Sequence, residues 1–333
     1  MEVELRNLTM ISLIVLLSLS YCYAIGKKIP KGVKRLLYVF PIIVIFLYLP
    51  LNLYSFYLIF FTFFSITWLG NSKLLLFAFG KGPLSSNSSM SLVVFWAVAS
   101  LPIKLQQNPP PNRRNKQQPY PENPKNNGSS ILINAFKVSL LAIIVYTTNN
   151  YSVYIHPEIL LQFMTGLLIY LSLEMTLALV SALVGSLLGL ELDPTFNEPL
   201  LSTSLQDFWG RRWNLVATNI LRLTVYEPTK KMFTNVFGHR WATSPAVVTT
   251  FLASGLIHEL MLYHMVRMKP TGEITVCLFL LHGMCVAVEI ELKKKFKKWR
   301  FPRMISMSLT LGFIVKTSTW FWFPIIKRLT VTG

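Results

Sequence analysis

Long apolar runs recur along the chain, and no other feature of the sequence restricts its fold as strongly. Several reach the roughly 20 residues that a helix needs to cross a hydrocarbon layer of about 30 Å. Hydrophobic residues make up 53% of the chain, charged residues 14%, and the mean hydropathy is +0.48, which favours a polytopic membrane protein over soluble domains. We predict an all-α fold, a membrane helix bundle with about seven to nine transmembrane helices. The runs cover residues 8–25, 36–50, 51–69, 131–148, 159–190, 245–266, 274–290 and 304–326.

Three runs need separate interpretation. Residues 159–190 exceed one crossing and are expected to tilt or bend, whereas residues 91–103 are short enough to be re-entrant or interfacial. Residues 8–25 have the length of a signal peptide as well as of a crossing. Because Glu2 and Glu4 precede this run and the basic residues follow it, we favour a retained first crossing.

The formal net charge of +18 raises the question of nucleic-acid binding. The positive residues cluster between apolar runs, in residues 26–35, 104–125, 211–240 and 293–303. This placement is typical of positive-inside topology and of anionic lipid head groups, so no nucleic-acid partner is predicted. Provided that residues 91–103 do not cross, it predicts that residues 26–35, 192–240 and 293–303 face the cytosol. The N-terminus and residues 149–158 and 267–273 then face the lumen.

We expect one membrane-embedded domain over residues 1–333, interrupted by two polar segments. Residues 106–130 are rich in proline and asparagine, which predicts a flexible exposed loop. Residues 191–243 are predicted to be a cytosolic or interfacial segment with an amphipathic helix over residues 202–226. In that helix Asp207, Arg211, Asn214 and Thr218 would share a polar stripe opposite the apolar face.

Residues 204–214 (SLQDFWGRRWN) gather charge, an amide and two indoles at a membrane edge. Each Arg alone is typical of a positive-inside anchor, and each Trp alone of the membrane interface. The amide of Asn214 favours a binding role, because it suits an oxygen or phosphate ligand near the head groups. The predicted substrate-binding residues here are Asp207, Trp209, Arg211, Arg212 and Trp213.

Residues 254–260 (SGLIHEL) place an imidazole, His258, inside an apolar run, where a polar group is costly and needs a reason. A neutral histidine packed within the bundle is the alternative to a functional role. Glu259 is expected to be paired, protonated or in a wet cavity. His282 is a second intramembrane imidazole, for which core packing is the favoured interpretation and lining a polar cavity with His258 the alternative. Glu259 and His282 complete the substrate-binding candidates.

Several other chemistries are excluded by spacing. A zinc hydrolase needs a second histidine four residues after the first, and Leu262 occupies that position. The chain has no glycine-rich phosphate loop and no Gly-x-Ser-x-Gly elbow. Cys22, Cys277 and Cys285 all lie in apolar runs and indicate neither a disulfide framework nor a metal site. No metal and no cofactor are predicted.

At three segments, residues 202–214, 225–228 (VYEP) and 254–260, the chain resembles the membrane-bound O-acyltransferase family. More specifically, it resembles the plant wax synthase branch, the long-chain-alcohol O-fatty-acyltransferases. Residues 73–84 (KLLLFAFGKGPL) and 101–104 (LPIK) also resemble that branch, so the resemblance spans nearly the whole chain. It departs at residues 222–224, which read Arg-Leu-Thr where the branch has Arg-Pro-Thr, and in a C-terminal end without a further crossing.

The resemblance implies a membrane-bound O-acyltransferase fold in the endoplasmic reticulum, with His258 and Asn214 as the catalytic pair. It implies transfer of a fatty acyl group from acyl-coenzyme A, as co-substrate, to the hydroxyl of a long-chain fatty alcohol, forming a wax ester. A neutral imidazole is suited to remove the hydroxyl proton, and an amide to stabilise the oxyanion. The partners are therefore acyl-coenzyme A, a lipid alcohol and membrane lipid.

Two alternatives remain open at this stage. A sterol is the rival acceptor, since both alcohols dissolve in the membrane. A membrane transporter or channel is the alternative from a different class, with His258, Glu259 and His282 forming an ion path. That alternative predicts inverted repeats, and the sequence has no visible internal symmetry.

Overall fold

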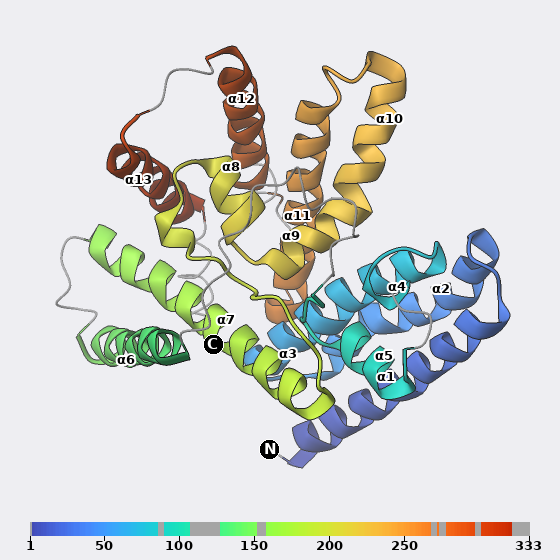
Figure 1. Ribbon diagram of the computed structural model, residues 1–333. Helices are drawn as coiled ribbons and strands as arrows, with labels where there is room; N and C mark the ends of the chain where they lie inside the picture. The colour runs from blue at the N-terminus through green and yellow to red at the C-terminus, as the bar shows by residue number, and fades with distance from the viewer. Residues whose placement is uncertain are drawn as a thin grey trace. The chain divides into compact units, whose positions relative to one another are not determined.

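The computed structural model describes residues 2–85, 90–106, 127–151, 158–267, 272, 278–296 and 301–321 (Figure 1). Within these ranges the regular elements are helices, and no strand longer than an isolated bridge forms. Six helices are long and apolar enough to cross a membrane, in agreement with the predicted all-α bundle. The predicted number of crossings, about seven to nine, stays a prediction. The six are Glu2–Lys28, Val33–Asn52, Phe56–Ala78, Leu132–Tyr151, Leu160–Leu188 and Thr243–Val266.

The chain divides into two compact units. The first combines Met1–Lys104 with Pro194–Gly333, and the second is Leu105–Asp193. The single domain predicted over residues 1–333 stays a prediction. Nearly all of the predicted loop at residues 106–130 lies outside the described residues, so its flexibility is also a prediction.

In the first unit, α1 (Glu2–Lys28) carries acidic residues in its first turn and lysines in its last, which suits the helix dipole. Gly32 joins it to α2 (Val33–Tyr48) with φ of 122°, a conformation that glycine adopts readily. The buried guanidinium of Arg35 donates to the carbonyl oxygens of Ile29, at 2.6 Å, and Gly26, at 3.1 Å. These bonds satisfy the last carbonyls of α1 and hold the turn closed. Helix α2 continues into η1 (Leu49–Asn52).

The third apolar helix is built from α3 (Phe56–Thr62), the π-helical segment η2 (Phe63–Gly70) and α4 (Asn71–Ala78). Every residue of η2 is buried. Helix α5 (Leu92–Ser100) follows the short η3 (Pro83–Ser85), and its nine residues span about 14 Å, too little for a crossing. The buried ammonium of Lys73 donates to the carbonyl oxygens of Val98, at 2.7 Å, and Leu101, at 2.6 Å. A side chain of α4 therefore satisfies carbonyl groups at the C-terminal end of α5.

The second unit consists mainly of α6 (Asn127–Tyr151) and α7 (Glu158–Leu188), which pack against each other. Lys137 of α6 and Glu174 of α7 form an ion pair at 2.8 Å. At 31 residues α7 exceeds the thickness of the hydrocarbon layer, as its apolar run predicted. The backbone N–H of Gln106 donates to the carbonyl of Glu191 at 3.0 Å, which joins the two ends of this unit.

The prediction of a single amphipathic helix over residues 202–226 is wrong, because the helical conformation is interrupted at Trp213 and Asn214. Asn214 adopts the left-handed conformation, with φ of 36° and ψ of 70°, which asparagine tolerates better than most residues. The predicted polar stripe is therefore split into two parts. The elements on either side are η6 (Pro199–Leu201), α8 (Leu205–Asp207), η7 (Phe208–Arg212), α9 (Leu215–Leu221), η8 (Arg222–Tyr226) and α10 (Glu227–Phe237).

The last described helices are α11 (Thr243–Val266), α12 (Leu281–Lys295) and α13 (Arg303–Phe321). Helices α11 and α12 pack closely, and Figure 1 shows them side by side in orange and red. A Cβ at Gly283 would lie 2.7 Å from the Cβ of Phe251, so this approach requires a glycine.

Beyond the apolar run at residues 274–290, the polar end of α12 holds α11 by side-chain hydrogen bonds. Glu291 accepts from the hydroxyl of Ser244, at 2.9 Å, and from the ammonium of Lys294, at 2.8 Å. The hydrogen bond from Lys294, followed by that from Ser244, lowers the pKa of the Glu291 carboxyl below its ordinary value. The ionised carboxylate is thus the form that this contact favours.

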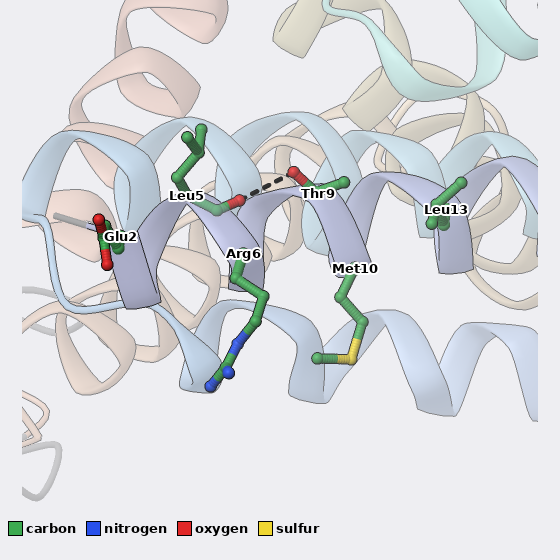
Figure 2. Close-up of a pocket in the computed structure, with 6 residues that line it drawn as sticks. All are labelled: Glu2, Leu5, Arg6, Thr9, Met10 and Leu13. Atoms are coloured by element: carbon green, nitrogen blue, oxygen red, sulfur yellow. Dashed lines mark hydrogen bonds between the residues drawn. The ribbon is translucent and has the colours of Figure 1, made fainter.

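A hollow lies along the first turns of α1 (Figure 2). All of its lining residues come from that one helix, and Figure 2 shows the Thr9 hydroxyl bonded to the Leu5 carbonyl of the same helix. Leu5, Met10 and Leu13 are largely exposed there, as expected of a surface that faces lipid chains. None of the predicted site residues lines this hollow, so it is not the candidate active site.

Candidate active site

The segment that carries Trp209 and Asn214 is anchored on the polar end of α12. Glu289 accepts hydrogen bonds from the backbone N–H groups of Leu205, at 2.9 Å, and Gln206, at 3.4 Å. A carboxylate at the first N–H groups of a helix stabilises its start. Lys293 pairs with Glu289 and donates to the hydroxyl of Ser204 at 2.9 Å. These contacts fix where α8 begins relative to α12.

Asp207 and Arg212, both predicted substrate-binding residues, form an ion pair with each other. Nε of Arg212 lies 2.7 Å from Oδ2 of Asp207, with both side chains largely buried. The same guanidinium donates to the backbone carbonyls of Asn197 and Glu198, each at 3.2 Å. The pair therefore ties the preceding loop to η7, and the predicted substrate-binding role of both residues stays a prediction.

Arg211, the neighbour of this ion pair, is exposed. Within the described part of the chain, no hydrogen bond or ion pair engages its guanidinium. Of the two adjacent arginines, Arg211 is the one available to an anionic ligand. A solvent-facing guanidinium is suited to bidentate binding of phosphate.

Asn214 lies at the break between η7 and α9 and is 6% exposed. Its Oδ1 accepts from the backbone N–H of Ala217 at 3.2 Å, so the side chain caps α9. The hydroxyl of Thr218 donates to the carbonyls of Trp209, at 3.1 Å, and Trp213, at 3.2 Å, which holds the break closed. Because Oδ1 is used by the cap, Nδ2 is the side-chain group left to donate. Among the described residues it has no hydrogen-bond partner.

A chain of hydrogen bonds links Trp209 through His282 to α13. Nε1 of Trp209 donates to Nδ1 of His282 at 3.1 Å, and Nε2 of His282 lies 2.8 Å from the hydroxyl of Thr317. Since an indole N–H can only donate, Nδ1 carries the lone pair and Nε2 the proton of a neutral ring. The Thr317 hydroxyl in turn donates to the carbonyl of Phe313 at 2.8 Å. Both nitrogens of His282, which is 1% exposed, are thereby occupied, so this ring positions Trp209.

His258 lies half-buried in α11, one turn after Ser254. Its Nδ1 is 2.7 Å from the backbone carbonyl of Ser254, and a carbonyl only accepts, so Nδ1 carries the proton of the neutral ring. The lone pair of His258 is therefore on Nε2, whereas that of His282 is on Nδ1. Glu259 follows in α11 and is 6% exposed.

Aromatic rings connect His258 to the segment that carries Asn214. The centroid of Phe279 lies 4.5 Å from that of His258 and 6.4 Å from that of Trp209. Trp209 contacts Trp213 at 6.2 Å, and Trp213 precedes Asn214. A short row of rings therefore links His258 to Trp213, the residue before Asn214, and among the described residues Asn214 makes no hydrogen bond to His258.

Four contributing residues were missed from the sequence. Glu289 and Thr317 anchor Trp209 and its segment, Phe279 contacts His258, and the indole of Trp68 lies 6.3 Å from the His258 ring. All four lie in apolar runs or at their ends, and only the polarity of Glu289 and Thr317 within such runs gave a signal. Among the described residues no three His, Cys, Asp or Glu side chains gather as a metal site requires. The predicted absence of a metal stays a prediction.

Known proteins match this chain both as a family and as individual relatives. The model of the membrane bound O-acyl transferase family matches residues 192–281, which include every predicted site residue except His282. Acyl-CoA–sterol O-acyltransferase 1 of Arabidopsis thaliana is 42% identical over 96% of this chain and 90% of its own length. Probable long-chain-alcohol O-fatty-acyltransferase 3 of the same plant is 40% identical over 98% and 92%. The long-chain-alcohol O-fatty-acyltransferase of Simmondsia chinensis is 37% identical over 98% and 91%.

The chain therefore belongs to the membrane bound O-acyl transferase family. It is a membrane protein and an acyltransferase, similar over nearly its whole length to plant relatives named for long-chain alcohols and for a sterol. The resemblance carried by residues 202–214 and 254–260 is confirmed. Membership of an enzyme family leaves the transporter or channel alternative without support.

Proposed function

We propose that this chain transfers a fatty acyl group from acyl-coenzyme A to the hydroxyl of a long-chain fatty alcohol, forming a wax ester. The observation that carries the proposal is the tautomer of His258. Its Nδ1–H is held by the Ser254 carbonyl, which leaves the lone pair on Nε2 in the position of a general base. The long-chain-alcohol relatives supply the acceptor class.

In the proposed reaction, Nε2 of His258 takes the hydroxyl proton while the alcohol oxygen attacks the thioester carbonyl carbon. The carbonyl oxygen becomes an oxyanion, to which Nδ2 of Asn214 donates a hydrogen bond. As the carbonyl reforms, the carbon–sulfur bond breaks, and the thiolate takes the proton back from His258. The products are an ester and free coenzyme A, with no other reactant.

The two substrates enter this arrangement from different sides. Coenzyme A carries phosphates, and Arg211 offers an exposed guanidinium beside the Trp209–Asn214 segment. The lipid alcohol approaches among the apolar helices that surround His258. This assignment uses the cytosolic orientation of residues 192–240 given by the positive-inside rule, with the enzyme in the endoplasmic reticulum and in contact with membrane lipid. Acyl-coenzyme A serves as co-substrate, and no cofactor is required.

A sterol is the second candidate acceptor. It is favoured by the 42% identity to acyl-CoA–sterol O-acyltransferase 1, a value above those of the long-chain-alcohol relatives described here. Both acceptors present one hydroxyl on a membrane-dissolved body, so the reaction at His258 is the same for each. One microsomal preparation offered a fatty alcohol and a sterol in equal amounts with labelled acyl-coenzyme A decides between them. Preferential labelling of steryl ester would replace the wax ester assignment.

Replacement of His258 tests the reaction itself. In microsomes of a host without this activity, His258→Ala is expected to lower ester formation by about 10²- to 10⁴-fold, the usual contribution of a general base. His239→Ala is the matched control, because His239 is exposed in the loop after α10, and it should retain wild-type activity. The amount of each protein is measured by immunoblot. Ester formation by an accumulated His258→Ala protein at the rate of the control would refute the assignment.

A further inference from the structure

The indole N–H of Trp68 is a buried donor that the reaction described so far does not use. Trp68 lies in the π-helical segment η2 and is 9% exposed. Its Nε1 atom is inaccessible and, within the described residues, has no hydrogen-bond partner. Buried polar groups are nearly always paired, so an orphan of this kind needs an explanation. Widened helical turns of the π type occur frequently at functional sites.

Other indoles of the same unit are satisfied by side chains. Nε1 of Trp96 donates to the hydroxyl of Ser20 at 3.1 Å, and Nε1 of Trp209 donates to His282 at 3.1 Å. The fold of this unit can therefore supply a side-chain acceptor for the N–H of an indole. Trp68 has no such acceptor among the described residues, and a bound molecule would supply one.

The neighbours of Trp68 include His258 and apolar aromatic rings. Its ring centroid lies 6.3 Å from that of His258 and 5.4 Å from that of Phe64, which stacks on Phe60 at 6.1 Å. His258 thus lies near two aromatic rings that have different neighbours. Phe279 also contacts Trp209, in the segment assigned to coenzyme A, whereas Trp68 contacts Phe64 in the Phe56–Ala78 helix.

We propose that Trp68 binds the acceptor alcohol, its indole N–H donating to the hydroxyl oxygen that His258 deprotonates, with the hydrocarbon body along Phe64 and Phe60. This inference rests on the proposed acyl transfer. A hydroxyl oxygen has one proton and two lone pairs. The proton points to Nε2 of His258, one lone pair accepts from Trp68, and the other attacks the thioester. Three directions fixed at one oxygen orient the nucleophile before reaction.

Trp68→Phe removes the N–H and keeps an aromatic ring. The variant is expected to raise KM for the alcohol about tenfold, the effect of one lost hydrogen bond to a substrate, with KM for acyl-coenzyme A within twofold of wild type. Trp96→Phe is the matched control, because it removes an indole N–H from the same unit without a ring contact to His258. An unchanged KM for alcohol, or a change confined to acyl-coenzyme A, overturns the proposal.

A second measurement needs no variant and so does not depend on folding. The methyl ether of the alcohol keeps an acceptor oxygen but has no proton for His258, and the alkane of equal length lacks the oxygen. Against wild-type enzyme the ether is expected to compete with the alcohol at least about fivefold better than the alkane. Equal inhibition by the two overturns the role of Trp68. Absence of ester from wild-type membranes with every alcohol would instead refute the proposed acyl transfer.

Discussion

The hydrogen bond between Trp209 and His282 gives the most quantitative prediction for the stability of the site. In Trp209→Phe the aromatic ring remains, but Nδ1 of His282 loses its donor at 3.1 Å in a side chain that is 1% exposed. Leaving a buried acceptor without a partner costs about 1–3 kcal/mol. His282→Leu removes the acceptor and orphans the Trp209 N–H, with a cost of the same order. In the double variant neither orphan remains.

The loss of stability in Trp209→Phe/His282→Leu is therefore expected to fall short of the sum of the two single losses by about 1–2 kcal/mol. The measurement is equilibrium unfolding of the purified protein in mixed micelles by titration with sodium dodecyl sulfate. Trp96→Phe, which breaks a bond to Ser20, serves as the control and should add to His282→Leu within about 0.5 kcal/mol. Additive losses for Trp209 and His282 would refute the tautomer assigned to His282.

Three further outcomes follow from the described contacts. Asn214→Asp keeps the cap on Ala217 but loses the Nδ2 donor, so thermal stability in detergent should stay near wild type while ester formation falls about 10²- to 10³-fold; equal losses of both would contradict the role of Nδ2. Gly283→Ala places a Cβ 2.7 Å from the Cβ of Phe251 and should lower the free energy of unfolding by about 1–3 kcal/mol, measured by the same detergent titration. An unchanged free energy of unfolding would show that α11 and α12 can move apart without cost. Because the folded pKa of Glu291 is lowered, its stabilisation is present above the ordinary value of 4.5 and is lost as pH falls through the folded pKa. The gap in melting temperature between wild type and Glu291→Gln should therefore close below pH 4.5, and a constant gap would show that the carboxylate does not act through its charge.

The apolar helices were predictable because the constraint acts locally. A hydrocarbon layer requires about 20 apolar residues in sequence, and the run at residues 245–266 accordingly forms α11, Thr243–Val266. The position of His258 on that helix followed from the same pattern. The short run at residues 91–103 was likewise recognised from its length, and α5 occupies only nine of those residues.

The break at Asn214 was not predictable from periodicity, since the apolar residues keep their spacing across it. The left-handed conformation of Asn214 ends one helical segment and begins the next. It is stabilised by the cap to Ala217 and by the Thr218 hydroxyl. The sequence also could not tell which arginine is available to a ligand and which is held by an ion pair. Arg211 and Arg212 are adjacent and identical in type, and only the contact of Arg212 with Asp207 distinguishes them.

The contacts around His258 depend on residues distant in the sequence. Phe279 and Trp68 belong to other apolar runs, in which an aromatic residue carries no signal of its own. Ring tautomers require the identity of both partners, and for His282 these are Trp209 and Thr317 from two separate segments. The two segments of the candidate site could therefore be located from the sequence, but the residues of other helices that contact His258 and Trp209 could not.

The ammonium of Lys73 makes two neighbouring helices interdependent. It supplies donors to the carbonyls of Val98 and Leu101 from a side chain that is 1% exposed, where water is not available to replace them. Any shift in register between α4 and α5 separates these groups and leaves the Lys73 nitrogen and two carbonyls unsatisfied together. A chimaera with a relative is for that reason best designed with residues 71–101 exchanged as one block, so that Lys73 and both of its acceptor carbonyls come from the same protein.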